Sequence, residues 1–252
     1  MALLNHHSAS ILPYICLDGT VHFILEKKSA DYRPPFFDTA LNFLGGNFDA
    51  RDKSPEDTLE REVLEEFWSL TEEHESLNAL LCQKFLPVEA RVDVRLPEEI
   101  VGVLSELGPR LLVGHKLAGS YIMTVHSPIA NPELTYGSTI FMKALSAEDY
   151  AHFKLMIELF SGRLTTDSWK HGSSVVDVSL KDINGRNLKF AWGYDKVINE
   201  LLKANKLPEQ PSGVIRPLGL VDVASLECPA DIEKTEMGVP TYAGLSVAHK
   251  YK

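Results

Sequence analysis

Hydrophobic and polar positions change their spacing along the chain, and the spacing predicts an order of strands and helices. β-forming residues at 10–16 and 21–26, joined through Asp18-Gly19, predict a hairpin with a tight turn. Helical spacing at 147–160 and 194–204 predicts two helices, the second with Val197, Leu201 and Leu202 facing the core. Strands are also expected at 40–44, 110–116, 120–126, 138–144, 174–178 and 219–223, and a loop is expected at 127–136. Two further helices are expected at 73–85 and 97–107, and Gly108-Pro109 should end the second of them.

The clearest helix start is the segment Ser54-Pro55-Glu56-Asp57. Serine can cap the helix, proline suits its first position, and the two acids complement the positive end of the helix dipole. We expect this helix to run to about Trp68, after a short strand that ends in Gly45-Gly46.

Three glutamates of this helix fall on one stripe. Glu62, Glu65 and Glu66 stand at positions i, i+3 and i+4, beside an apolar stripe of Leu59, Val63 and Phe67. Carboxylates at this density repel one another unless a cation lies between them, and hard oxygen ligands suit Mg²⁺ or Mn²⁺. The alternative is a solvated acidic face, partly neutralised by Arg61.

The segment from Gly45 to Trp68, with its strand, loop, capped helix and R-E-V-L-E-E core, resembles the Nudix box G-x5-E-x7-R-E-U-x-E-E-x-G-U, where U is aliphatic. The box has its first glutamate where this chain has Lys53, and Asp52 is a candidate to take its place. Trp68 stands where the box has its terminal glycine, and Asn47 stands where the box has its first glycine. Gly46 matches that first glycine only if the loop has one extra residue. The resemblance covers residues 1–205 and implies an α/β fold, an α/β/α sandwich around a mixed sheet.

Members of this family use Mg²⁺ or Mn²⁺ to hydrolyse a pyrophosphate bond in a nucleoside diphosphate linked to another moiety. The resemblance implies that Glu62, Glu65 and Glu66 are metal ligands, that Glu65 or Glu66 assists or acts as the base that activates water, and that Arg61 holds a glutamate in place. Glu133 is the candidate for a further catalytic glutamate from a loop outside the box; its other interpretation is a solvated loop residue.

Candidate substrate-binding residues lie in and around the same segment. Gly45 and Gly46 either let the backbone approach a metal or phosphate closely or simply turn the chain. Arg33 is close enough in sequence to meet a phosphate, and Phe36 is either a substrate contact or a core residue. Trp192, at the start of the last helix, offers a stacking surface or a buried anchor.

Composition narrows the function classes further. The chain of 252 residues has a net charge of −10, so nucleic acid is not an expected partner. Without a long apolar segment or a signal peptide, we expect a cytoplasmic protein without membrane contact. Three distant cysteines predict buried free thiols rather than a disulfide or zinc site. Residues 206–252 are expected to be a proline-containing extension that packs on the same domain.

Two functions from different classes therefore remain open. The first is a hydrolase whose substrate is a small nucleotide derivative. The second is a module with the same fold that binds a nucleotide ligand or mediates assembly, with weak or no turnover; Lys53 favours it, since a cation beside the glutamates can occupy them. A homodimer is compatible with either function.

Overall fold

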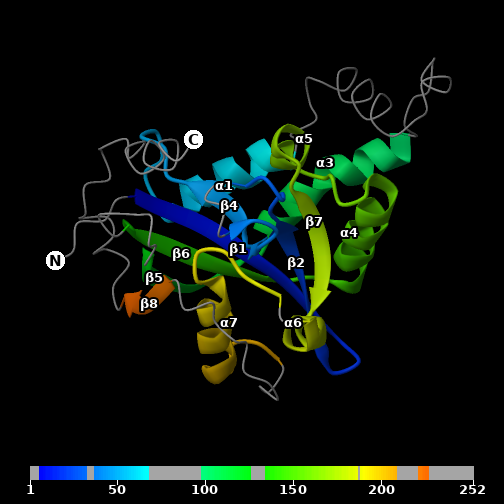
Figure 1. The fold of residues 1–252 in the computed structure, drawn as a ribbon. Coiled ribbons are helices and arrows are strands. Elements are labelled where there is room, and N and C mark those ends of the chain that lie inside the picture. Colours follow the sequence, from blue (N-terminus) through cyan, green and yellow to red (C-terminus); the bar gives the residue numbers. More distant parts are fainter. Residues whose placement is uncertain are drawn as a thin grey trace.

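A mixed sheet with helices on both faces forms the molecule (Figure 1). The computed structural model describes residues 6–32, 37–67, 98–125, 134–186, 188–208 and 221–226. Within these residues the strands are β1 (His6–Leu17), β2 (Thr20–Lys27), β3 (Leu41–Asn42), β4 (Leu44–Asn47), β5 (Lys116–Val125), β6 (Leu134–Ala144), β7 (Ser174–Ser179) and β8 (Val221–Leu226). The helices are α1 (Pro55–Glu66), α3 (Glu98–Leu112), α4 (Ala147–Phe160), α5 (Thr166–His171), α6 (Leu180–Arg186) and α7 (Tyr194–Lys203).

The sheet has the strand order β3-β2-β1-β6-β5-β8, with β4 also paired to β1 and β7 to β2. β1 and β6 run parallel, whereas β1 and β2 form the expected antiparallel hairpin. Its turn places Asp18 at φ 50° and Gly19 at φ 73°, the positive values that a tight two-residue hairpin turn requires. The sheet is therefore mixed, as predicted.

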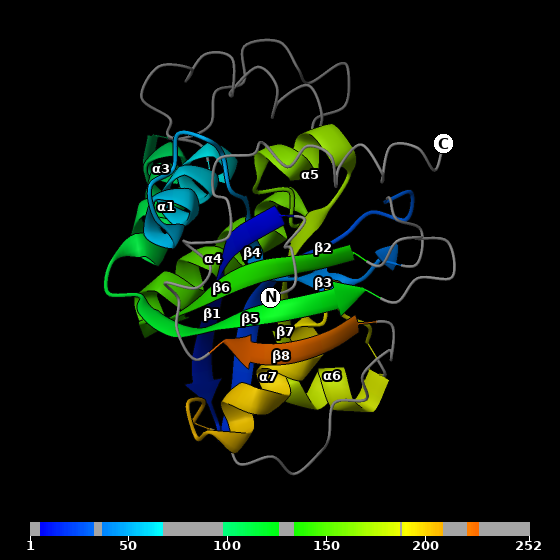
Figure 2. The ribbon, with the colours of Figure 1, turned by 90° about the vertical axis from the view of Figure 1, so that its left-hand side faces the viewer.

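Two hydrophobic clusters hold the helices against the two faces of the sheet. One cluster joins β1 and β4 to α1, α3 and α4 through residues such as Ile11, Leu59 and Phe153. The other joins the opposite face to α6 and α7 through residues such as Phe23 and Val197. Figure 2 shows the two helical layers above and below the strands. The predicted α/β sandwich around a mixed sheet is confirmed.

Helix α1 forms where its capping signals predict it. Ser54 Oγ accepts a hydrogen bond of 3.1 Å from the Asp57 backbone N–H, and Pro55 occupies the first turn. The predicted apolar stripe of Leu59, Val63 and Phe67 is buried, with at most 2% of each residue exposed. The Phe67 ring meets Phe153 of α4 edge to face, 6.0 Å between centroids. Burial of this stripe directs the neighbouring glutamate stripe towards β4 and α5.

Helix α3 continues through Gly108-Pro109, so the predicted helix end and the predicted strand at 110–116 are both wrong. Pro109 removes one backbone N–H in a late turn, but Leu107 and Leu111 on either side of it are buried, 1% and 0% exposed. Gly108 lets the helix lie close to α1, because a Cβ there would stand 2.8 Å from Phe67 Cβ. Tertiary packing therefore outweighs the local signal to stop.

Other differences from the sequence analysis are local. The strand expected at 40–44 is divided at Phe43 into β3 and β4, and β4 contains Gly45-Gly46 instead of ending before them. β6 begins at Leu134, so residues 134–136 of the expected loop are strand. The short helices α5 and α6 were not predicted, and Cys16 is exposed. The helix expected at 73–85 lies outside the described residues.

The remaining expected elements are present. α4 and β7 form where the sequence predicts them, β5 starts earlier than expected, and α7 buries Val197, Leu201 and Leu202. In the C-terminal part, β8 pairs antiparallel with β5 over six residue pairs, from Ser120↔Leu226 to Val125↔Val221. Among the described residues, no helix has the length and hydropathy needed to cross a membrane.

Replacing either of two glycines of α3 by alanine should change the stability of the protein in opposite directions. Gly108→Ala should destabilise the protein by about 1–3 kcal/mol, because the new methyl group would collide with Phe67 on α1. Gly102→Ala is the matched control: nothing lies within 4 Å of its Cβ position, and alanine should stabilise the helix by roughly 0.5–1 kcal/mol. Urea unfolding measures both. Equal effects of the two substitutions would contradict the close approach of α3 to α1.

Candidate functional site

Arg61 on α1 is the centre of the hydrogen-bond network that fixes the loop before the helix. Its Nε and Nη2 donate to the two oxygens of Asp52 at 3.0 and 2.8 Å, and Nη2 also donates to the Asn47 carbonyl at 2.7 Å. The side chains of Arg61 and Asp52 are 18% and 4% exposed. Arg61 thereby ties the end of β4 and the following loop to α1, and Asp52 is fully engaged in this role.

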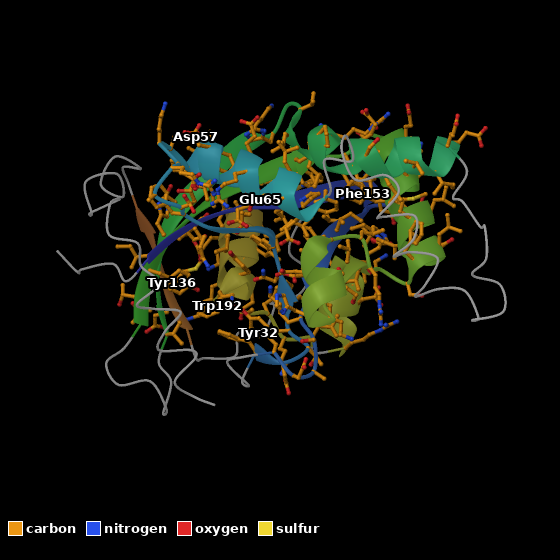
Figure 3. The ribbon with its side chains drawn as sticks, turned by 90° about the horizontal axis from the view of Figure 1, so that it is seen from above. Tyr32, Asp57, Glu65, Tyr136, Phe153 and Trp192 are labelled. Atoms are coloured by element: carbon orange, nitrogen blue, oxygen red, sulfur yellow. The ribbon has the colours of Figure 1, made fainter. Side chains whose placement is uncertain are left out.

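The same guanidinium also holds two of the candidate glutamates. Arg61 Nη1 donates to Glu62 at 2.9 Å and to Glu65 at 3.2 Å, so these carboxylates lie side by side at one nitrogen. The hydrogen bonds to Asp52, and then the charge of Glu62 and the hydrogen bond to it, raise the pKa of Arg61 beyond its ordinary value, against the effect of burial. The Glu65 side chain is 56% exposed, and Figure 3 shows it near the end of α1 opposite Asp57.

Gly46 of β4 is required by the position of Glu62. A Cβ on Gly46 would stand 2.2 Å from Glu62 Oε2, so the carboxylate packs directly on the glycine backbone. Gly45 has a φ of 134°, and a Cβ there would stand 2.3 Å from the Ala9 carbonyl oxygen of β1. Gly46 thus leaves room for the Glu62 carboxylate, whereas Gly45 lets β4 lie close enough to β1 to pair with it.

Glu66 lies one turn further along α1 and points towards α5. Its Oε2 accepts a hydrogen bond of 3.0 Å from the Asp167 backbone N–H. It lines a pocket between α1, β4 and α5 together with Glu26 of β2 and Asp167. Burial, and then the charges of Asp167, Glu26 and Glu62, raise the pKa of Glu66 to about 7, although the hydrogen bond from Asp167 opposes this rise.

Glu26 adds a buried carboxylate to the pocket. Its Oε2 accepts hydrogen bonds from Lys28 Nζ at 2.6 Å and from Asn42 Nδ2 at 3.2 Å. Its Oε1 is buried and has no hydrogen-bond partner among the residues that the structure describes. Lys28 also lies 5.0 Å from the centre of the Tyr32 ring. Of the three carboxylates that line the pocket, Glu26 thus pairs with Lys28, and Asp167 lies 3.7 Å from His171.

The donor set has the chemistry of a divalent-cation site but not its full geometry. Glu62 and Glu65 provide adjacent hard oxygen donors, whereas Glu66 is directed into the pocket beside α5. In the parts of the chain that the structure describes, no three His, Cys, Asp or Glu side chains are grouped closely enough to hold a metal ion. Metal binding by Glu62, Glu65 and Glu66 stays a prediction.

The other predicted residues lie around or outside this site. Trp192 is half-buried, with its ring 4.7 Å from that of Phe37 and 5.4 Å from that of Tyr136, between centroids, and it hydrogen-bonds to Tyr32. In Figure 3, Trp192, Tyr136 and Tyr32 lie apart from Glu65. Lys53 is exposed, and its backbone N–H donates to Asp57. Arg33, Phe36, Trp68 and Glu133 lie outside the described residues.

The sequence analysis missed Glu26 and Asp167. Glu26 is the acid that follows the apolar run Phe23–Leu25, with Lys28 two positions later, a weak sign of a buried pair. Asp167 follows Thr165, whose Oγ1 accepts from the Ser168 N–H and caps α5. Neither signal is specific, because only the fold brings these residues to Glu66.

Loss of the Asp52 carboxylate should destabilise the loop before α1. We expect Asp52→Asn to cost about 1–3 kcal/mol at pH 7, because charge-assisted hydrogen bonds to Arg61 are lost. Burial raises the pKa of Asp52, but its hydrogen bonds lower the pKa by a larger amount, so the pKa lies below its ordinary value of 3.8. The stabilisation should therefore vanish as the pH falls through this lowered pKa. Urea unfolding at pH 7 and at falling pH values below 3.8 measures this. Asp49→Asn is the control, because Asp49 pairs with the exposed Arg51; equal costs of the two substitutions at pH 7 would contradict the prediction.

Glu66 should make the stability of the protein depend on pH. The raised pKa means that folding favours the protonated acid, so its contribution is fully present below pH 4.5 and is lost as the pH rises through about 7. Glu66→Gln should therefore match the parent at low pH and be more stable at pH 8, by up to roughly 3 kcal/mol at 1.4 kcal/mol per pKa unit. Urea unfolding with EDTA measures the difference, with Glu60→Gln as control. If the stability difference between Glu66→Gln and the parent does not grow with pH, the clustering of carboxylates around Glu66 is contradicted.

Comparisons with known proteins add structural likenesses of low identity. No family model and no curated protein match the sequence. Similar solved structures include Shewanella oneidensis NrtR complexed with a 27mer DNA, with a TM-score of 0.42, 11% identity, and coverage of 81% of this chain and 62% of that one. The NUDIX domain of the same protein complexed with ADP ribose has a TM-score of 0.40, 10% identity and coverage of 81% and 90%. A NUDIX hydrolase from Alicyclobacillus acidocaldarius has a TM-score of 0.31, 15% identity and coverage of 56% and 70%.

Proposed function

We propose that the chain is a metal-dependent pyrophosphohydrolase of the Nudix type, which cleaves a nucleoside diphosphate linked to another moiety. The observation that carries this proposal is the placement of Glu62, Glu65 and Glu66. Two of them meet at one nitrogen of Arg61, and the third lines the adjoining pocket. This arrangement agrees with the resemblance of the R-E-V-L-E-E segment to the Nudix box.

Glu62, Glu65 and Glu66 would hold Mg²⁺ or Mn²⁺, which supplies charge neutralisation at the phosphate oxygens and a more acidic water. Arg61 fixes the helix register and holds Glu62 on the Gly46 backbone. Glu65, whose side chain is 56% exposed beside Arg61, is open to solvent on the outer side of α1. Glu66, with a pKa of about 7, is suited to accept or release a proton near neutrality.

The second candidate function is binding of a nucleotide ligand without turnover. It is favoured by the Arg61 guanidinium, which already supplies positive charge to Glu62 and Glu65. Lys53, whose charge suggested this function from the sequence, makes no ion pair with the three glutamates in the described structure. Arg61 is therefore the residue on which this alternative depends.

Turnover separates the two functions. The protein is incubated with dinucleotides, sugar nucleotides and nucleoside triphosphates in Mg²⁺ or Mn²⁺, and released phosphate products are quantified. Hydrolysis of one class should fall about 100-fold or more in Glu65→Gln and in Glu66→Gln, since each would lose a carboxylate that would hold the metal or handle a proton. Glu60→Gln on the exposed side of α1 should keep full activity.

A different pattern would support the binding module. In that case one of these nucleotides raises the melting temperature of the protein, while no substrate of the panel is hydrolysed with either metal. If no substrate is hydrolysed and no nucleotide stabilises the protein, both candidate functions are contradicted.

A further inference from the structure

Helix α5 lies beside the end of α1 and covers the pocket into which Glu66 points (Figure 1). Thr165, which caps α5, and Asp167 in its first turn line this pocket opposite Val63 and Glu66 of α1. The space between them is about 20 Å³, enough for about one water molecule. A hydrated metal ion or a phosphate group is larger than this space. Such a ligand therefore does not reach Glu66 while α5 stays in this position.

A hydrogen bond fastens the first turn of α5 to α1. The Asp167 backbone N–H donates to Glu66 Oε2 at 3.0 Å. The next amide of that turn, at Ser168, donates to Thr165 Oγ1 at 3.1 Å, so its partner belongs to the same segment. The Asp167 N–H is thus the group of this turn that depends on α1, and it occupies one oxygen of the candidate metal ligand Glu66.

The buried side chains described at the start of α5 are hydroxyls. Thr165 and Ser168 are 3% and 1% exposed, and their side-chain oxygens lie 2.8 Å apart. The two hydroxyls stay paired when the segment moves as a unit, and neither side chain has a large apolar surface. Separating them from the rest of the protein therefore costs less free energy than separating the aromatic contact of Phe67 and Phe153 between α1 and α4.

The loop 163–173, which carries α5, has its two ends joined at one base. The Val175 N–H of β7 donates to the Gly162 carbonyl at 2.6 Å. Gly162 and Gly172 have φ values of 76° and 74°, so the chain bends on either side of α5. A Cβ on Gly162 would stand 2.4 Å from the Val175 carbonyl oxygen, so glycine allows this close pairing. A loop of this length whose ends meet can move as one compact unit while its base stays on the sheet.

We propose that the loop 163–173, with α5 at its centre, is a lid that opens to let a divalent cation reach Glu66. In the closed state, the Asp167 N–H occupies Glu66 Oε2. Opening breaks this hydrogen bond and frees the carboxylate. A cation that binds the freed carboxylate shifts the population towards the open state. The inference rests on the proposed function and adds to it the control of access to the site by α5.

Two substitutions at Asp167 separate the role of its N–H from that of its carboxylate. Proline removes both groups and is tolerated in the first turn of a helix, whereas alanine removes the carboxylate alone. The dissociation constant for Mn²⁺, measured by electron paramagnetic resonance of the free ion, should be about tenfold lower in Asp167→Pro than in Asp167→Ala. The reason is that one charge-assisted hydrogen bond no longer favours the closed state. Equal or weaker Mn²⁺ binding by a folded Asp167→Pro, or no Mn²⁺ binding by the parent and both variants, would overturn the proposal.

Hydrogen exchange on the parent chain tests the same motion and decides the matter if Asp167→Pro does not fold. Mg²⁺ should increase deuterium uptake in peptides from 163–173 and leave uptake in α4 unchanged, because the cation favours the open lid. In Glu66→Gln, Mg²⁺ should no longer have this effect. Uptake in 163–173 that stays the same or falls when Mg²⁺ is added to the parent would overturn the lid.

The lid and the proposed function fail in different experiments. Tighter Mn²⁺ binding in Asp167→Pro, with no hydrolysis of any substrate of the nucleotide panel, would support the lid and contradict turnover. Hydrolysis by the parent, with equal Mn²⁺ binding in Asp167→Pro and Asp167→Ala, would support turnover and overturn the lid.

Discussion

The pairing of Arg61 with Asp52 is the interaction on which the geometry of the site depends. A largely buried guanidinium is stable only when its donors are used, and here they reach Asp52, the Asn47 carbonyl, Glu62 and Glu65. These partners belong to the end of β4, the loop and α1, so one side chain fixes three segments relative to one another. The close contact between Glu62 and Gly46 follows from this anchoring and from the missing side chain of the glycine.

The acidic residues near the C-terminal end of α1 form two groups, which pair with different cations. On the side of Arg61, Glu62 and Glu65 share one permanent cation. On the side of α5, Lys28 pairs with Glu26, and His171 lies 3.7 Å from Asp167. Burial, and then the charges of Asp167, Glu26 and Glu62, raise the pKa of Glu66 to about 7.

The sequence predicted well those parts of the fold whose signals are local. The hairpin turn at Asp18-Gly19, the Ser54 cap of α1 and the bounds of α4 depend on neighbouring residues, and all are present. The end of α3 was wrong because burial of Leu107 and Leu111 outweighs the effect of Pro109. The stripe of Glu62, Glu65 and Glu66 was visible from helical spacing. The contribution of Glu26 and Asp167 was not, because long-range packing brings β2 and α5 to α1.

The loop before α1 keeps a buried carboxylate at the Arg61 guanidinium without using Lys53. Asp52, one position earlier, makes both hydrogen bonds to Arg61, so the loop keeps a buried carboxylate at the guanidinium. Lys53 can then be exposed, where its charge is solvated and its backbone N–H supports Asp57. The loop before α1 therefore depends on Asp52 and Arg61 and not on the side chain of Lys53.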